Sequence, residues 1–370
     1  MSSLVENLRQ PVRRSRRECG WVGMEIDPRG LKLAVVEWTP AGISLRAADL
    51  LVWPDDVALD DLDAFGAALD RSLADWQTRY PAVPARQVAC GLPQDWLRTT
   101  QVSIASRDDA VVAAQAKELA SRLAGAPADT VAWDYWVSPF QLNSAEGATE
   151  AGGTLTLNVA ATDMVLMLER TLGRRGLELA VVDSSPFITA RAAAIAAPAA
   201  SQLAAAWDLD GLTLTWLVQG EPKYARRTEN IPLLRAYEQL RQQLSVEDED
   251  CRCLLAMYGL PQQDLPHGNL QRAIGRALIG VLDDLQHEIE RTLRFIEQRP
   301  FAQRVENCLL TGDGAAIRGL DRELRSRISR VTRSWSLPTA GGSIGGDVEC
   351  AAYADAAALS ALPLLRPESM

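Results

Sequence analysis

Apolar and polar positions alternate along the opening of the chain as they do in β-strands. The stretch GMEIDPRGLKLAVVEW, residues 23–38, predicts two short strands around a turn that contains Pro28 and Gly30. Residues 42–53 predict a third strand. Residues 60–80 are acidic and have apolar positions three and four apart, which predicts an amphipathic helix.

The same pattern of three strands and two turns returns in the second half of the chain. Residues 205–231 predict strand, turn at Asp210–Gly211, strand, turn at Gly220–Pro222, and strand. The two hairpins lie about 180 residues apart, far beyond the period of solenoid repeats. The sequence therefore predicts a duplicated domain.

Strands and helices fill the rest of both halves. Further strands are expected at residues 86–93, 98–106, 130–140, 154–162, 177–186 and 330–335. Helices are expected at 108–125, 162–176, 233–244, 250–258, 269–298 and 348–362, and a strand, glycine turn and helix at 306–328. Thr162 or Asp163 is a candidate N-cap. Residues 143–153 and 338–347 read as polar and glycine-rich loops.

Charge and composition narrow the classes of partner. With 47% hydrophobic and 23% charged residues, the chain is typical of a folded globular protein. Its net charge of −10 disfavours nucleic acid, which is bound mainly by cationic side chains. The exception is Arg9 to Arg17, with five arginines in nine residues. This segment is either a solvated tail or a contact for anionic lipid or an acidic partner.

Cysteine and histidine usage points to the cytoplasm and away from a metal site built from several histidines. The six cysteines are scattered, and the Cys251–Cys253 pair is closer than the usual zinc spacing, which favours buried thiols in a reducing compartment. His267 and His287 are the only histidines and are expected at the surface. The N-terminus lacks the apolar run of a signal peptide, and the most apolar stretch, Ala190 to Trp207, falls short of a membrane span.

Three segments together resemble the nucleotide-contact segments of the actin, Hsp70 and sugar-kinase superfamily. GMEIDPRGLKLAVVE resembles the first phosphate loop of the PilM-like family of type IV pilus assembly proteins, related also to the cytoplasmic part of the type II secretion protein GspL. WDLDGLTLTWLVQGEPKYAR is similar to the second loop of that family, and LLTGDGAAIRGL to its adenosine motif. The resemblance implies an α/β, actin-like (ribonuclease H-like, duplicated) fold with two halves and an inserted sub-domain.

The resemblance also implies a domain division. It runs as follows: 1–19 basic tail; 20–97 first part of sub-domain 1A; 98–178 inserted sub-domain 1C; 179–204 continuation of 1A; 205–232 first part of 2A; 233–303 helical 2B; 304–337 continuation of 2A; 338–370 glycine-rich loop and closing helix of 1A.

Seven residues occupy the positions that the family uses for ATP. They are Glu25, Asp27, Lys32, Asp208, Asp210, Gly312 and Gly314. Glycine turns of this kind let backbone N–H groups approach phosphate, and carboxylates at strand ends hold Mg²⁺. The resemblance assigns the Mg²⁺ to Glu25 and Asp208.

Departures from the family pattern predict a degenerate nucleotide site. Asp27, Asp210 and Asp313 stand where the family usually has glycine, and Pro28 removes one backbone donor. Two unit charges about 4 Å apart repel by roughly 4 kcal/mol at an effective dielectric constant of 20, so extra carboxylates oppose a triphosphate.

Several of these residues also have simpler interpretations. Asp27 and Asp210 are ordinary hairpin-turn residues, and Lys32 fits a solvated lysine of an edge strand. Asp183 is a candidate ligand group at a strand end or an N-cap for the helix after Pro186, and the cap is favoured. Trp133, Tyr135 and Trp136 form either a partner surface or, in alternation, part of a core.

The resemblance implies a cytoplasmic scaffold, peripheral to the inner membrane, of a type IV pilus or type II secretion machine. Its cleft between the first sub-domain and the insertion takes the N-terminal cytoplasmic peptide of a bitopic inner-membrane partner. The alternative is an active actin-like ATPase whose closure on nucleotide regulates assembly. A sugar or acid kinase is a weaker third possibility, because no additional acidic motif marks a catalytic base.

Overall fold

A computed structural model describes most of the chain. The described residues are 19–54, 57–59, 61–138, 152–262, 268–299, 303–339 and 350–365. The five arginines of the tail, His267 and most residues of the two predicted loops lie outside them.

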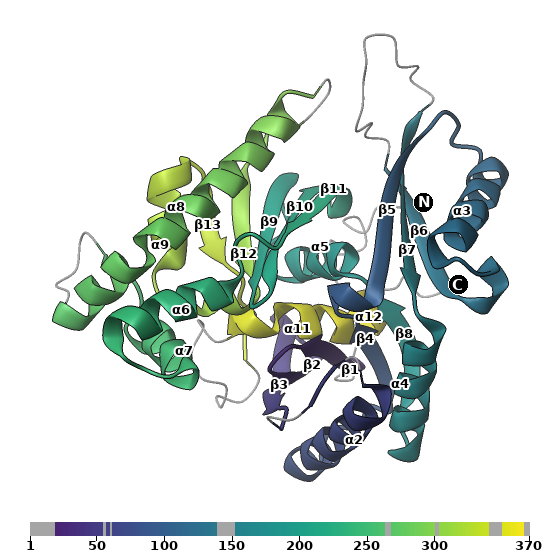
Figure 1. Cartoon of the computed structure of the whole chain (residues 1–370), viewed down its shortest axis with the longest axis horizontal. Helices are drawn as coiled ribbons and strands as arrows, with labels where there is room; N and C mark the ends of the chain where they lie inside the picture. Colours follow the sequence, from purple (N-terminus) through teal and green to yellow (C-terminus); the bar gives the residue numbers. More distant parts are fainter. Residues whose placement is uncertain are drawn as a thin grey trace. The chain divides into compact units, whose positions relative to one another are not determined.

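The strands form two five-stranded sheets and one three-stranded sheet within the described residues (Figure 1). The first sheet has the order β3-β2-β1-β4-β8 and contains β1 (Val22–Asp27), β2 (Gly30–Thr39), β3 (Gly42–Val52), β4 (Gln87–Gly91) and β8 (Glu178–Asp183). The second has the order β11-β10-β9-β12-β13 and contains β9 (Ser201–Asp208), β10 (Gly211–Val218), β11 (Glu221–Thr228), β12 (Asn307–Thr311) and β13 (Val331–Ser334). The third has the order β5-β7-β6 and contains β5 (Leu97–Ile104), β6 (Ala132–Ser138) and β7 (Gly153–Ala160).

The two larger sheets repeat one topology. Each has three strands that are consecutive in the chain, followed in the sheet by two strands from later in the same half. Antiparallel pairing joins β9, β10 and β11, whereas β12 pairs in parallel with β9 and β13, as β4 does with β8. The predicted duplication is confirmed, with β1 equivalent to β9.

Helices fill the connections at the positions that the apolar spacing predicts. In the first half they are α2 (Leu62–Arg79), α3 (Asp109–Ala124), α4 (Thr162–Arg174) and α5 (Ser185–Ala196). In the second half they are α6 (Leu233–Leu244), α7 (Asp248–Met257), α8 (Asn269–Glu297), α9 (Leu320–Ile328), α11 (Ala354–Ser360) and α12 (Leu362–Leu365), with the short 3₁₀ segments η3 (Asp313–Ala316) and η4 (Ala351–Tyr353). The predicted closing helix is therefore three short pieces.

Some predicted turns and caps differ from the structure. Gly30 is the first residue of β2 and does not belong to the turn. Glycine is required there, because a Cβ would lie 2.4 Å from the carbonyl oxygen of Leu51. Pro222 belongs to the edge strand β11, where a proline is tolerated. The N-cap position of α4 is Ala161, not Thr162 or Asp163.

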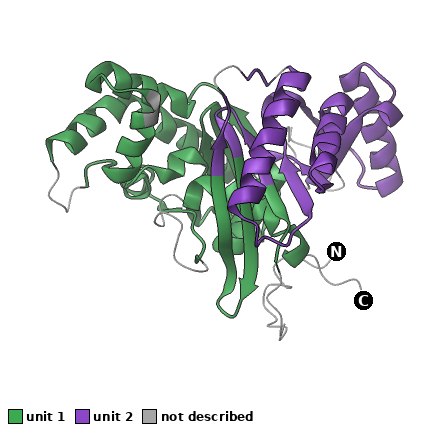
Figure 2. Ribbon diagram, turned by 90° about the horizontal axis from the view of Figure 1, so that it is seen from below, with its two compact units in different colours: residues 1–23, 32–49, 186–370 green, residues 24–31, 50–185 purple. Residues whose placement is uncertain are grey.

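The chain folds as two compact units, each built from separate stretches of the sequence (Figure 2). Unit 1 comprises residues 1–23, 32–49 and 186–370, and unit 2 comprises residues 24–31 and 50–185. The eight-part domain division expected from the resemblance stays a prediction.

In unit 1, small side chains let helix α11 approach the first strands closely. The Ser360 hydroxyl donates to the Trp21 carbonyl oxygen at 2.6 Å and accepts from the Val36 N–H at 2.9 Å. A Cβ on Gly23 would lie 1.8 Å from the Ala356 carbonyl oxygen. Only a glycine at residue 23 therefore leaves room for the backbone of α11.

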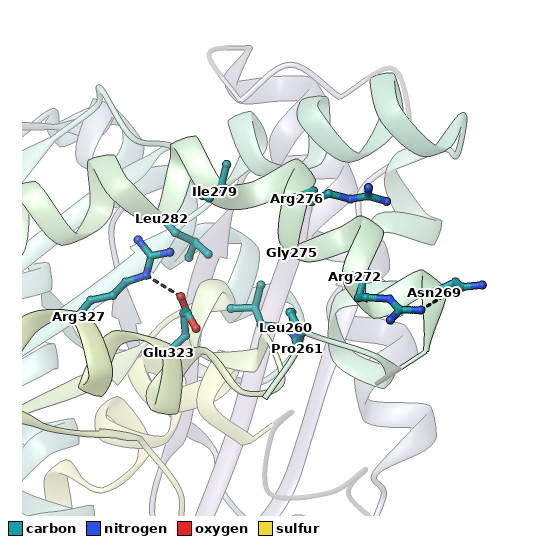
Figure 3. A pocket seen from close by; sticks show the side chains of 10 residues that line it. All are labelled: Leu260, Pro261, Asn269, Arg272, Gly275, Arg276, Ile279, Leu282, Glu323 and Arg327. Atoms are coloured by element: carbon teal, nitrogen blue, oxygen red, sulfur yellow. Dashed lines mark hydrogen bonds and ion pairs between the residues drawn. The ribbon is translucent and has the colours of Figure 1, made fainter. Parts of the chain in front are cut away.

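The long helix α8 of unit 1 buries one face and borders a groove with its other side. Its buried residues recur at helical spacing, from Ile274 through Leu278 to Leu285. A cavity of about 480 Å³ lies between the first half of α8, the connection that precedes it and α9 (Figure 3).

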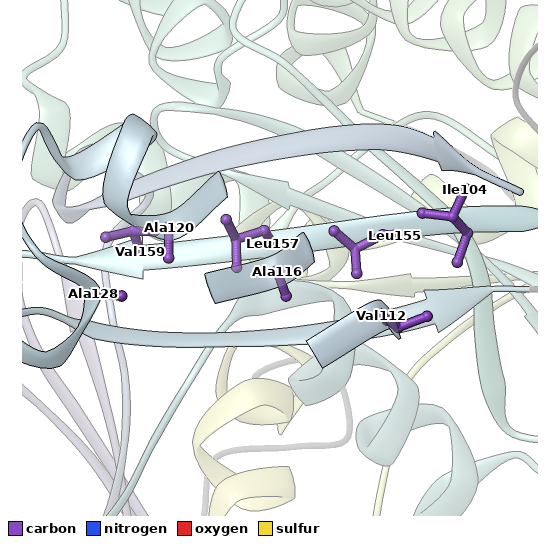
Figure 4. Close-up of a cluster of buried hydrophobic side chains, with 8 residues drawn as sticks. All are labelled: Ile104, Val112, Ala116, Ala120, Ala128, Leu155, Leu157 and Val159. Carbon is purple, nitrogen blue, oxygen red and sulfur yellow. The ribbon is translucent and has the colours of Figure 1, made fainter. Parts of the chain in front are cut away.

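Unit 2 contains the three-stranded sheet with its own core. Helix α3 covers one face of this sheet, where Ile104, Val112, Ala116, Leu155 and Leu157 are almost fully buried (Figure 4). Trp133 and Tyr135 pack against this cluster, which confirms the core interpretation for those two aromatics. Alternation places Trp136 on the opposite face.

The thiols are mostly buried, as predicted. Cys90, Cys251, Cys308 and Cys350 are buried, Cys19 is half-buried and Cys253 is exposed. Burial raises the pKa of Cys308 to about 12. His287 is exposed, also as predicted.

Candidate functional site

The buried lysine of the first hairpin meets an aspartate from the second half of the chain. Lys32 lies on β2, and its Nζ is 3.3 Å from Oδ2 of Asp313, the first residue of η3. The two side chains are 2% and 6% exposed. Since β2 lies between β3 and β1, the interpretation of Lys32 as a solvated edge-strand lysine is wrong.

The loop that carries Asp313 packs directly on the end of β9. Gly312 has a φ of 77°, and a Cβ on it would lie 2.2 Å from Oδ1 of Asp208. A Cβ on Gly314 would lie 2.4 Å from the Trp207 ring. Only glycine fits at residues 312 and 314. Gly312, Gly314 and Asp208 therefore lie close together in unit 1, as the resemblance predicts.

The end of β9 and the loop packed on it therefore each carry a carboxylate, Asp208 and Asp313, and Lys32 is the cationic partner of Asp313. Asp208 ends β9 and is half-buried, whereas Asp313 is 8% exposed. A buried charge in a protein is normally paired, because desolvation of an isolated ion is costly. The Lys32–Asp313 ion pair meets that requirement for Asp313.

Asp210 lies in the turn between β9 and β10, away from this loop's contacts. Its Oδ2 is 2.5 Å from Nη2 of Arg227 on β11, and Arg227 also donates to the Thr213 hydroxyl at 3.3 Å. The arginine thus joins the turn to the neighbouring strand. This arrangement agrees with the simpler interpretation of Asp210 as a turn residue.

In unit 2, the turn of the first hairpin is fixed by its own side chains. Asp27 Oδ1 accepts the Arg29 N–H at 2.9 Å, the local turn that aspartate favours, and Arg29 Nε lies 3.6 Å from the same oxygen. The Trp53 indole donates to the Asp27 carbonyl oxygen at 2.8 Å. Trp53 in turn meets the Phe65 ring edge to face at 5.3 Å. Asp27 is buried as part of this anchored turn.

Glu25 belongs to unit 2 and Asp208 to unit 1. Glu25 lies on β1 and is half-buried. Among the described residues, no group of three or more histidine, cysteine, aspartate and glutamate side chains has a geometry that could hold a metal ion. The assignment of Mg²⁺ to Glu25 and Asp208 stays a prediction.

Asp183 ends β8, beside the inserted sheet of unit 2. Its Oδ1 accepts the Ser184 N–H at 2.7 Å, and α5 begins at Ser185, so Ser184 and not Asp183 directly precedes the helix. The Ser184 hydroxyl accepts from the Asn158 amide of β7 at 2.9 Å, and Thr99 of β5 donates to the same Asn158 side chain at 2.7 Å. Polar side chains thus link the end of β8 to the insertion.

Sequence reasoning missed the partners that fix these residues. Arg227 lies on β11 and Trp53 directly follows β3, and their contacts with Asp210 and Asp27 depend on strand register. Asp313 was seen as a departure from the glycine pattern, but its partner Lys32 is 281 residues away in the chain. The sequence did contain a signal that Lys32 has a specific role, since it is one of only three lysines in a chain rich in arginine.

Comparison with known proteins identifies the fold. A chain of the PilM–PilN type IV pilus biogenesis complex superimposes with a TM-score of 0.69 and 19% identity, covering 94% of this chain and 99% of that one. The ethanolamine utilization protein EutJ from Carboxydothermus hydrogenoformans superimposes with a TM-score of 0.52 and 10% identity, covering 95% and 92% of the two chains.

The chain has the actin-like fold. Near-complete coverage in both directions means that both halves and the insertion take part in the match with the pilus complex. No family model matches the sequence. No curated protein sequence matches it either. Chains this different in sequence share a fold without necessarily sharing an activity, so these matches show the fold alone.

No helix among the described residues is long and apolar enough to cross a membrane.

Proposed function

We propose that this chain is a PilM-like scaffold of a type IV pilus or type II secretion-type machine. The observation that carries the proposal is the match to the PilM–PilN type IV pilus biogenesis complex over 94% of this chain and 99% of that one. The scaffold would act in the cytoplasm at the inner membrane. Its partner would be the N-terminal cytoplasmic peptide of a bitopic inner-membrane protein.

The insertion offers suitable chemistry for such a peptide. On the face opposite α3, strand register aligns Gln101 and Trp136 on either side of Thr156. Thr99 and Asp134 flank Asn158 in the next row. Thr156 is only 2% exposed and Asn158 is bonded to Thr99 and Ser184, so the peptide would contact mainly Gln101, Asp134 and Trp136. Amide, hydroxyl and carboxylate groups bind peptide backbone and basic side chains, and Trp136 adds an apolar contact. Peptide capture on such a face needs a preformed surface and no catalysis.

The charges near Lys32 argue against ATP as a ligand of this scaffold. The lysine that the resemblance assigns to phosphate is ion-paired with Asp313, in a loop that packs against Asp208 at the end of β9. A triphosphate would add negative charge beside two carboxylates, and it would compete with Asp313 for the lysine. These residues do not fit the nucleotide, which supports a degenerate site and disfavours the ATPase alternative.

Isothermal titration calorimetry of the full chain tests both parts of the proposal. The ligands are Mg-ATP and a synthetic peptide with the N-terminal cytoplasmic sequence of a single-span inner-membrane protein, which the proposal expects to be encoded immediately downstream. We expect the peptide to bind and Mg-ATP to give no heat. Trp136→Ala should weaken peptide binding, whereas Val111→Ala, an exposed residue of α3, should leave it unchanged.

Two results would contradict the proposal. Absence of peptide binding by the folded full chain would remove the scaffold assignment. Micromolar binding of Mg-ATP with turnover would favour the active ATPase instead. The two titrations are independent, so each part can fail alone.

A further inference from the structure

A preformed groove borders helix α8 in unit 1, far along the sequence from the first hairpin. Its volume is about 480 Å³, within the range of specific binding pockets. The apolar lining comes from Leu260, Pro261 and Leu282, and Ile279 adds an apolar side chain that is 57% exposed. Figure 3 shows Leu282 on the side of α8 that faces Leu260 and Pro261, whereas Ile279 extends from the upper side of the helix.

Close backbone packing holds the walls of the groove in place. A Cβ on Gly275 would lie 2.8 Å from the Pro261 ring, so α8 touches the connection at this point. On the other side, the Leu260 N–H donates to the Arg318 carbonyl oxygen at 2.9 Å, and Gly259 with a φ of 60° lies against the same residue. The apolar floor is thus fixed before any ligand arrives.

The rim of the groove carries positive charge that the described part of the chain does not neutralise. Arg272 and Arg276 stand one helical turn apart on α8, at the edge of the groove. Arg272 donates to the neutral side-chain oxygen of Asn269, and within the described residues Arg276 forms no ion pair. Like charges at this spacing destabilise a helix, so the arrangement costs the fold some stability.

The third arginine of the groove, Arg327, differs from Arg272 and Arg276 because it forms ion pairs with carboxylates. Arg327 is bound by Glu323 at 2.6 Å and by Asp283 at 2.5 Å. A chain with a net charge of −10 has ample acidic residues to pair its arginines, and Arg226 and Arg330 are paired in the same way. Two guanidinium groups without a carboxylate over an apolar floor therefore mark a local site for a ligand that is both acidic and apolar.

We propose that this groove binds an acidic segment of another protein. One apolar side chain of that segment occupies the floor beside Leu260, Pro261 and Leu282, and Ile279 offers a further apolar contact at the rim. A neighbouring aspartate or glutamate accepts hydrogen bonds from Arg272 and Arg276, whose planar guanidinium groups suit a carboxylate. A bilayer surface is flat and does not reach into a concave floor, so the geometry favours a peptide over anionic lipid.

This site is separate from the proposed function. It lies in unit 1 on α8, whereas the proposed peptide surface of the insertion lies in unit 2. A scaffold with both would join two different partners. The groove can be tested without the first partner.

A peptide array of random 12-residue sequences, probed with the labelled full chain, tests the proposal. We expect the strongest binders to combine aspartate or glutamate with a large apolar residue. The double variant Arg272→Glu/Arg276→Glu should weaken them by about tenfold or more, because charge-assisted bonds are lost and repulsion is added. Ile279→Ser should weaken the same peptides through the apolar contact alone.

Arg304→Glu is the matched control, since Arg304 is exposed in unit 1 and does not line the groove. It should bind the same peptides as the unchanged chain. Equal binding by the double variant and the control would overturn the proposal, as would selection of basic peptides.

Two further measurements separate other occupants from a partner peptide. Self-association in sedimentation that the double variant abolishes would place a second copy in the groove and overturn the assignment to another protein. Flotation with phosphatidylglycerol vesicles that depends on Arg272 and Arg276 would overturn it in favour of lipid. Folding of each variant is checked by its circular dichroism and thermal midpoint.

Discussion

Lys32 and Asp313 show how a single substitution can redirect a charged site. Aspartate at a position where the PilM-like pattern has glycine places a carboxylate within 3.3 Å of the lysine that the same pattern assigns to phosphate. Both side chains are nearly excluded from water, where the attraction between them is strong and the cost of leaving one alone is high. The protein supplies from its own chain the anion that the lysine requires.

Removal of the lysine alone should destabilise the fold strongly. Lys32→Met leaves Asp313 buried without this partner, for which we expect a loss of about 3 to 5 kcal/mol in the free energy of unfolding. The double variant Lys32→Met/Asp313→Asn should recover much of that loss, because the second change removes the uncompensated charge. Urea unfolding of the four chains of this double-mutant cycle measures the coupling.

Lys117→Met provides the control for this cycle. Lys117 pairs with Asp129 at 2.9 Å, but the two side chains are 54% and 80% exposed. Exposed pairs contribute about 0 to 1 kcal/mol, so this variant should be nearly neutral. An equally small effect of Lys32→Met would mean that the buried pair has no structural role.

Residue-scale prediction succeeded where a feature is local. Asp27 was expected as a turn residue, and its side chain accepts the N–H of Arg29, two positions later. Residue-scale prediction failed where the partner is distant in the chain. Spacing along the sequence does not reveal that Asp210 pairs with Arg227 or that Lys32 pairs with Asp313. Chemistry at the candidate site is decided by these long-range partners.

At the scale of elements, the glycine loop η3 depends on contact with the end of β9. Gly314→Ala would place a methyl group 2.4 Å from an atom of the Trp207 ring, which is itself held by a 2.9 Å bond from its indole N–H to the Ile231 carbonyl oxygen. Overpacking of this kind costs about 1 to 3 kcal/mol. Thermal unfolding should show a lowered midpoint.

Gly280→Ala is the control for Gly314→Ala, because an added methyl group at residue 280 meets no neighbouring atom. Gly280 lies within α8, is exposed, and has no atom within 4 Å of an added Cβ. Alanine there should stabilise the protein by up to about 1 kcal/mol, since glycine is a poor helix former. A loss of stability in both variants would show that packing against Trp207 is not what distinguishes Gly314.

Most elements were predictable because their signals are periodic and local. Helix α6 runs from Leu233 to Leu244 as predicted, and the long α8 ends one residue before its predicted end. The exceptions arise where neighbouring strands override turn propensity. Its residue type predicts Gly30 in the turn, yet Gly30 is the first residue of β2, and its lack of a side chain leaves room for the carbonyl oxygen of Leu51.

At the scale of the whole molecule, the duplication decides the fold. The two sheets have the equivalent strand orders β3-β2-β1-β4-β8 and β11-β10-β9-β12-β13. The equivalence of the first three strands in each could be anticipated from the two hairpins in the sequence. The places of the later strands could not, because β8 and β13 pair with strands that are separated from them by an insertion or a helix. Order within a parallel sheet is set by tertiary packing and not by local pattern.

Because the whole chain is acidic, the proposed contact with an anionic membrane rests on one basic segment. A net charge of −10 repels an anionic surface, but the five arginines between Arg9 and Arg17 lie in the first 17 residues, and basic residues near such a surface contribute about 1 kcal/mol each. Deletion of residues 1–18 should therefore abolish flotation with vesicles that contain phosphatidylglycerol. Flotation of the full chain should weaken as salt is raised, because the screening length falls to about 8 Å at 0.15 M. Neutral phosphatidylcholine vesicles should not bind either chain, and equal flotation of the two chains would place the membrane contact elsewhere in the protein.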